Sequence, residues 1–149
     1  MAARWLLATM AVGLFGTGAL RADLRPALAE KNLEKRSKLA LDNAEGAYQA
    51  VRQAYQKGDN NEVKAAAAEL LASVDLADKS LKDTGKDPRR SPRWFKHAEI
   101  VTRDLLRKLD GFQHEMDYSD RPMLDAVKAK TQQVHDDLLL GLMEGKKRK

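Results

Sequence analysis

The sequence predicts an all-α protein, an antiparallel up-down-up-down four-helix bundle made of two long helical hairpins. Apolar residues recur at intervals of three and four from about residue 27 to residue 142, and glycine and proline interrupt this pattern at only a few places. No stretch alternates apolar and polar residues as a half-buried strand does. Because the helical stretches are separated by short or capped turns, consecutive helices are expected to pack antiparallel.

An N-terminal signal peptide is predicted ahead of the bundle. Arg4 precedes a mostly apolar run from Trp5 to Leu20, and the sequence becomes charged after Ala22. This order is typical of a secretory signal peptide, with cleavage after Ala22 and an alternative cleavage after Ala29. The run holds about 16 residues, fewer than the roughly 20 that span a bilayer, so export to the periplasm or beyond is favoured over an uncleaved anchor.

The predicted domain organisation is residues 1–22 as signal peptide, 23–145 as helical bundle and 146–149 as a basic tail. The whole chain has a formal net charge of +5. Residues 1–22 contain two arginines and no acidic residue, and the tail contains four basic residues, so the bundle itself carries a formal charge of −1. A nearly neutral body lacks the positive field of a nucleic-acid-binding domain, and no nucleic-acid partner is expected.

The first predicted hairpin runs from about Ala27 to Asp83. Its first helix is expected to extend to Lys57, with Gly58 as a left-handed cap, and Asp59 with Glu62 three residues later predicts the start of the second helix. The predicted apolar stripes are Leu33, Ala40, Leu41, Ala44, Ala47, Tyr48, Val51, Ala54 and Tyr55 in the first helix and Val63, Ala67, Leu70, Val74, Ala77 and Leu81 in the second. The two helices are expected to meet largely through alanine, including Ala65 to Ala68 and Ala72.

The second predicted hairpin supplies the large apolar side chains that the alanine-rich first hairpin lacks. Ser91 and Pro92 suit the start of its first helix, which is expected to continue through Gly111. Ser119 or Asp120 is expected to cap the last helix. Pro122 falls in the first turn of that helix, and Gly145 ends it. The predicted stripes are Phe95, Ala98, Val101, Leu105, Leu109, Phe112 and Met116, then Leu124, Val127, Thr131, Val134, Leu138 and Leu142.

No catalytic, cofactor-binding or metal-binding residue is predicted. The chain contains no cysteine, which excludes disulfides, thiol nucleophiles and covalent haem attachment. It has no Glu-x-x-His pair of the kind that holds metals in helical bundles, and its three histidines, His97, His114 and His135, lie singly.

Isolated acidic residues are assigned to the surface. Asp136 or Asp137, beside His135, is expected to pair with Arg103 rather than to form a dyad, because neighbours on a helix do not face one another. Asp75 and Asp78 are expected on a solvated edge.

The candidate binding site is the loop between the two hairpins. The residues proposed to bind an anion or a partner combine positive charge with an aromatic ring; they are Lys86, Arg89, Arg90, Arg93, Trp94 and Lys96. Arginine beside an aromatic ring can bind phosphate or carboxylate through charge-assisted hydrogen bonds and stacking. The alternative interpretation is that Trp94 and Phe95 close the end of the bundle while the cations solvate an exposed loop.

The function predicted from these features is an exported, non-enzymatic helical-bundle protein, a binding or structural component of the cell envelope. The expected partner is a protein or another envelope component. The alternative is an anion-binding module that uses the loop from Arg89 to Lys96 against envelope polyanions or anionic lipid. An enzyme or metal carrier is a third hypothesis, and the alanine-rich seams suit packing within the chain and dimerisation equally.

Overall fold

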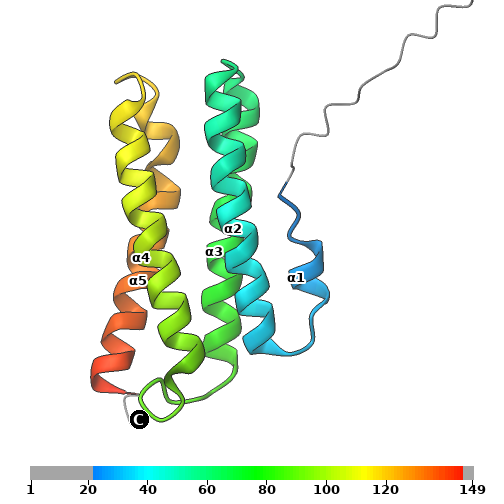
Figure 1. The fold of residues 1–149 in the computed structure, drawn as a ribbon, viewed down its shortest axis with the longest axis vertical. Helices are drawn as coiled ribbons and strands as arrows, with labels where there is room; N and C mark the ends of the chain where they lie inside the picture. Colours follow the sequence, from blue (N-terminus) through cyan, green and yellow to red (C-terminus); the bar gives the residue numbers. More distant parts are fainter. Residues whose placement is uncertain (1–21, 146–149) are drawn as a thin grey trace, which may run out of the picture.

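The computed structural model of the chain describes residues 22–145, and the regular structure of this part is entirely helical. Four long helices pack against one another (Figure 1), which confirms the predicted all-α class. The long helices are α2 (Leu33–Gln56), α3 (Asn60–Asp83), α4 (Pro92–Glu115) and α5 (Asp125–Glu144). A short helix α1 (Arg25–Ala29) precedes α2, and a 3-10 turn η1 (Arg121–Leu124) precedes α5. The basic tail and the predicted signal peptide, except Ala22, lie outside the described residues.

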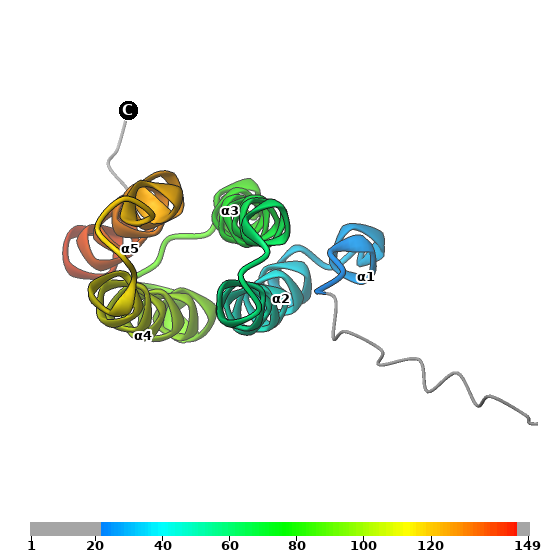
Figure 2. The same cartoon turned by 90° about the horizontal axis from the view of Figure 1, so that it is seen from above.

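Consecutive long helices run in opposite directions along the bundle (Figure 1). Seen from above, α2 and α3 form one pair and α4 and α5 form the other, while α1 lies outside these pairs beside α2 (Figure 2). The α2–α3 pair has the most extensive contacts. Alanine at the facing positions of these two helices allows their backbones to approach closely.

The core consists of residues from the predicted stripes. Leu41 and Val51 of α2, Leu70 and Val74 of α3, and Leu105 and Leu109 of α4 are each at most 1% exposed. From the last helical stretch, Leu124, Val127, Val134 and Leu138 are buried. The buried residues of both hairpins belong to one continuous cluster, so the two hairpins share one core.

One expectation about the alanine-rich segment is wrong. Ala67 is buried and Ala66 is partly buried, but Ala65, Ala68 and Ala72 are exposed. Four consecutive helical residues point in directions about 100° apart, so a run of four alanines cannot lie on one face. Of these four alanines, only Ala67, which lies on the same face of α3 as Val63 and Leu70, is buried in the core.

The first long helix is also shorter than predicted, because it is interrupted between α1 and α2. The side chain of Asn32 accepts a hydrogen bond of 2.9 Å from the Lys35 N–H and caps α2. The Asn32 N–H in turn donates to the Glu30 carboxylate at 2.8 Å. These local bonds compete with a continuous helix, since asparagine at this position satisfies backbone donors that would otherwise lack partners.

The remaining helices begin and end at the predicted capping residues and glycines, with two differences. Gly58, Gly85 and Gly145 have φ angles of 72°, 67° and 77° at the ends of α2, α3 and α5. Asp59 caps α3 by accepting the Glu62 N–H at 3.0 Å. Ser91 occupies the cap position of α4, but its side chain makes no capping hydrogen bond. The segment after Asp120 begins as η1 and becomes α-helical only at Asp125.

None of the helices within residues 22–145 combines the length and the apolar composition required to cross a membrane.

Candidate functional site

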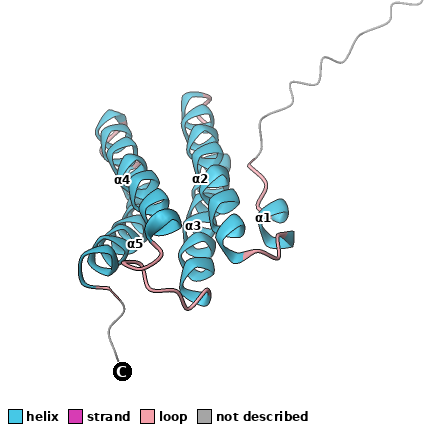
Figure 3. Cartoon of the chain, turned by 60° about the horizontal axis from the view of Figure 1, so that its bottom comes forward, coloured by secondary structure: helices cyan, strands magenta, loops and turns pink. Residues whose placement is uncertain are grey.

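The loop between α3 and α4 lies at one end of the bundle, beside the end of α5 (Figure 3). Its conformation is fixed by Asp87. The Asp87 carbonyl accepts the N–H groups of Arg90 at 3.1 Å and Ser91 at 2.9 Å, and its carboxylate accepts the Arg89 N–H at 2.8 Å. The loop thus leads into α4 through a hydrogen-bonded turn, and the side chains of Arg89 and Arg90 project from a defined backbone.

Gly141 in the last turn of α5 and Gly145 directly after the helix let the loop pack closely. A Cβ atom at Gly141 would lie 3.2 Å from Cγ of Pro88, and one at Gly145 would lie 3.0 Å from Cδ of Arg89. Both distances are too short for an ordinary side chain without movement of the neighbour. The end of α5 and the loop, more than 50 residues apart in sequence, are therefore in direct contact.

Four of the six candidate residues form an exposed group of positive charges. Arg89, Arg90, Arg93 and Lys96 are exposed, and none of these four side chains forms an ion pair with a carboxylate of residues 22–145. We call these four residues the basic cluster. Other unpaired lysines of the described chain, such as Lys57, Lys64 and Lys79, are dispersed along α2 and α3.

Lys86 is placed differently. Its Nζ lies 2.7 Å from a carboxylate oxygen of Glu34, near the start of α2. This pair connects the loop to the first long helix, and it holds the charge of Lys86 away from the basic cluster. Lys86 therefore contributes to the attachment of the loop rather than to an open binding surface.

The two aromatic residues have unequal environments. Phe95 is buried at 6% exposure, as the alternative interpretation of a closed bundle end expects. Trp94 is partly buried against the core, and the guanidinium carbon of Arg93 lies 5.0 Å from the centre of its ring. The Trp94 ring also meets His97 edge to face, with centroids 6.5 Å apart. Trp94 thus joins the basic cluster to the core.

A second set of charges lies next to the loop, between α3 and α5. Lys82 donates hydrogen bonds to Asp78 at 2.8 Å and to Asp137 at 3.2 Å. Burial acts to lower the pKa of Lys82, but the hydrogen bonds to both carboxylates outweigh it, and the pKa is raised above its ordinary value. All three charged groups are paired, and the set keeps a formal charge of −1.

The positions of these acidic residues correct two expectations. Asp78 is only 7% exposed, so its assignment to a solvated edge is wrong. Asp137 pairs with Lys82 of α3, and Arg103 instead lies 3.7 Å from Glu99 on its own helix. The reason is the rotation of α5, which turns Asp137 toward α3 rather than toward α4.

The histidines occupy three different environments. His114 is exposed, whereas Nδ1 of His135 is buried 3.7 Å from a carboxylate oxygen of Glu99. The His135 Nδ1 and the His97 Nε2 are buried without a hydrogen-bond partner. In residues 22–145, no group of three or more His, Asp and Glu is arranged to hold a metal ion.

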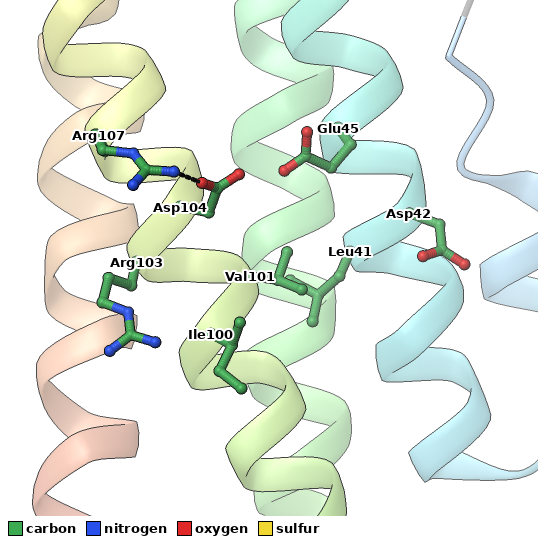
Figure 4. A pocket seen from close by; sticks show the side chains of 8 residues that line it. All are labelled: Leu41, Asp42, Glu45, Ile100, Val101, Arg103, Asp104 and Arg107. Carbon is green, nitrogen blue, oxygen red and sulfur yellow. Dashed lines mark hydrogen bonds and ion pairs between the residues drawn. The ribbon is translucent and has the colours of Figure 1, made fainter.

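An open groove between α2 and α4 has a volume of about 610 Å³ (Figure 4). Leu41, Ile100 and Val101 form its apolar part. Its charged residues are already paired: Arg107 binds Asp104, Glu45 binds Lys108 at 2.8 Å, and Asp42 binds Lys38 at 2.6 Å. Because these charged residues have partners within the protein, the groove gives no indication of what charge a ligand would carry.

No protein-family model, no curated protein and no solved structure matches this chain. The assignment of a site therefore depends on geometry and charge alone.

Sequence reasoning located the basic cluster but missed the residues that position it. Glu34, Gly141 and Gly145 come from distant parts of the chain, and nothing in the spacing of the loop residues points to them. The signal that was available is the antiparallel order of the helices, which brings the start of α2 and the end of α5 to the same end as the loop.

Proposed function

We propose that this protein is a non-enzymatic binding component of the cell envelope that recognises anionic groups through the basic cluster of Arg89, Arg90, Arg93 and Lys96. One observation carries this proposal. Four exposed cations gather at one end of the bundle without carboxylate partners in the described chain, whereas the charges around the α2–α4 groove and at Lys82 are paired. Unpaired, pre-positioned guanidinium groups are suited to bind phosphate or carboxylate.

The distribution of charge supports the same function. The bundle has a formal charge of −1, so the cluster is a local positive region on a nearly neutral body. The sequence continues from Gly145, which adjoins Arg89, with Lys146, Lys147, Arg148 and Lys149. The sequence thus adds four positive charges directly after α5, and their number favours a surface with many negative charges over a single small anion.

A binding role without catalysis is proposed because the carboxylates and Lys82 and Lys86 beside the site are engaged in ion pairs and the Nε2 of His97 is buried. Asp78 and Asp137 are tied to Lys82, and Lys86 is tied to Glu34. The basic cluster itself contains only arginine and lysine, with no carboxylate or imidazole among its members to act as a general base.

Location in the envelope, with an up-down-up-down bundle released from a signal peptide, is part of the proposal. Cleavage after Ala22 would keep α1, whose Ala27 is 1% exposed, whereas cleavage after Ala29 would remove it. Because cleavage after Ala29 would remove the buried Ala27, cleavage after Ala22 is the better match to the fold. The N-terminus of the protein isolated from cells, determined by mass spectrometry, is expected to be Asp23. An intact Met1 in a soluble cytoplasmic fraction would contradict export.

The decisive experiment removes the cluster's charge. The chain beginning at Asp23 contains the whole core, from Ala27 to Leu138, and can be applied to an acidic polymer such as immobilised polyphosphate. Changing Arg89, Arg90 and Arg93 together to Ser is expected to weaken binding about tenfold or more, through loss of charge-assisted hydrogen bonds. The binding should also weaken as salt is added.

A matched control removes the same number of charges elsewhere. Lys57, Lys64 and Lys79 are exposed and have no carboxylate partner among residues 22–145, so their joint change to Ser lowers the net charge equally. This variant is expected to retain most of the binding. Equal loss in both triple variants would show that only net charge matters, and the proposed site would be wrong.

A further inference from the structure

Exposed apolar side chains lie on the last turns of α5, at the same end of the bundle as the basic cluster. Leu139 is 42% exposed, Leu140 is 45% exposed and Met143 is 69% exposed. None of these residues belongs to the stripe that builds the core. Large apolar side chains grouped on a surface mark a site that is covered by another molecule.

The register of α4 and α5 places two of these apolar residues at the same level along the bundle as the cations. Lys128 of α5 binds Asp110 of α4, and His135 of α5 approaches Glu99 of α4. Because the helices are antiparallel, a turn toward the end of α5 matches a turn toward the start of α4. Leu139, four residues after His135, is therefore level with Lys96, three residues before Glu99.

Continuing by one more turn extends the same edge. Met143 follows Leu139 by four residues, and Arg93 precedes Lys96 by three, so this second pair is also at one level. The loop with Arg90 packs against the last turn of α5 through Pro88 and Gly141. The cations and the apolar side chains consequently share one edge of the molecule, at the end where α4 begins and α5 finishes.

We propose that this edge docks on an anionic membrane surface, with Leu139 and Met143 entering the interfacial region while Arg90, Arg93 and Lys96 bind lipid phosphates. The inference depends on the proposed function, since it names the anion that the basic cluster recognises. A soluble polyanion would gain nothing from the apolar side chains, whereas membrane binding combines buried apolar area with attraction to anionic headgroups. Trp94, between core and cluster, is of the residue type that prefers such an interface.

The test compares binding to vesicles with binding to immobilised polyphosphate. The chain beginning at Asp23 is used, so that the apolar run from Trp5 to Leu20 cannot itself bind lipid. Vesicles of phosphatidylglycerol and phosphatidylcholine are expected to bind the protein, and vesicles of phosphatidylcholine alone are not. Changing Leu139 and Met143 together to Ser is expected to weaken vesicle binding about tenfold or more, because two apolar side chains no longer insert.

Two controls separate insertion from damage and from charge. Leu28 on α1 and Tyr118 in the turn after α4 are 56% and 86% exposed and lie away from this edge, so their joint change to Ser should leave vesicle binding unchanged. The Leu139 and Met143 variant should also retain polyphosphate binding and its helical circular dichroism.

The outcomes distinguish the two proposals. If polyphosphate binding depends on the arginines while vesicle binding ignores Leu139 and Met143, the anion-binding function stands and the membrane inference is wrong. Binding to neutral vesicles as strong as to anionic ones, or no binding to either, would also overturn the membrane inference. If the arginine variant binds polyphosphate as well as the unchanged protein does, the proposed function itself fails.

Discussion

At the scale of single residues, Tyr55 links the two hairpins at the end of the bundle opposite the basic loop. Its hydroxyl donates to the Asp120 carboxylate at 3.2 Å and accepts the Asp117 N–H at 2.9 Å. The ring also packs edge to face on Phe112, with centroids 5.7 Å apart. The turn between α4 and η1 is thus attached to the end of α2 by one side chain.

Changing Tyr55 to Phe is expected to lower the free energy of unfolding by about 1 kcal/mol, because two hydrogen bonds are lost while the ring contact remains. Urea denaturation measures the difference. Tyr118→Phe is the control, since that side chain is 86% exposed. If Tyr55→Phe and Tyr118→Phe have equal stabilities, the hydroxyl of Tyr55 does not hold the turn.

Two ion pairs of α4, Asp104 with Lys108 and Asp110 with Lys128, are expected to make the stability of the fold depend on pH. A hydrogen bond from Lys108 lowers the pKa of Asp104, and a hydrogen bond from Lys128 lowers the pKa of Asp110. A carboxylate whose pKa is lower in the folded state stabilises that state above its unfolded pKa. The contribution disappears as the pH falls through the folded value.

The free energy of unfolding is therefore expected to decline as the pH falls below about 4, the usual pKa of aspartate. Changing Asp104 and Asp110 together to Asn should make this decline shallower, as measured by urea denaturation at several pH values. Asp83→Asn, an exposed position without an ion pair in the described chain, should leave the slope unchanged. An identical slope in the unchanged protein and the double variant would show that these pairs do not contribute.

At the scale of helices, two glycines that both have room for a side chain are expected to respond in opposite ways to substitution by alanine. Gly58 ends α2 with a φ of 72°, and Gly111 lies inside α4; a Cβ atom at either position would meet no atom within 4 Å. Any effect of alanine must therefore come from the backbone. Only Gly58 needs the left-handed conformation that a side chain disfavours.

Gly58→Ala is expected to lower the free energy of unfolding by about 1 kcal/mol, whereas Gly111→Ala should raise it by about 0.5 to 1 kcal/mol. Thermal unfolding of the two variants gives both signs in one comparison. Destabilisation by Gly111→Ala would mean that this glycine serves a contact or a bend that its surroundings do not show.

At the scale of the whole molecule, the fold brings the end of α5 to the basic cluster, which the sequence already holds together in residues 89–96. The loop after α3, the start of α4 and the end of α5 meet at one end of the bundle, although residues 88 and 141 are far apart in the chain (Figure 3). The cations come from one continuous segment, and the exposed apolar side chains Leu139, Leu140 and Met143 reach the same end from a distant part of the chain. The predicted effects of the arginine variant and of the Leu139 and Met143 variant are consequences of this arrangement.

The sequence by itself determined the helices and most of the core. Periodicity identified the faces that carry Leu70, Leu105 and Val134, and glycine with a positive φ marked the ends of α2, α3 and α5. These features are local, because a helix needs only its own residues to set the direction of each side chain. The break before Asn32 was missed, since a capping side chain there outweighed the periodic pattern.

Only the tertiary structure decided which charges are free. Lys86 and Arg89 look alike in the sequence of the loop, yet the Lys86 side chain pairs with Glu34 of α2, whereas the Arg89 guanidinium forms no ion pair with a carboxylate of the described residues. Likewise Asp137 of α5 meets Lys82 of α3 only through the packing of the two helices, whereas Asp78 pairs with Lys82 at a spacing of four residues within α3. Pairing depends on the relative rotation and register of helices far apart in the chain, and one-dimensional spacing does not contain that information.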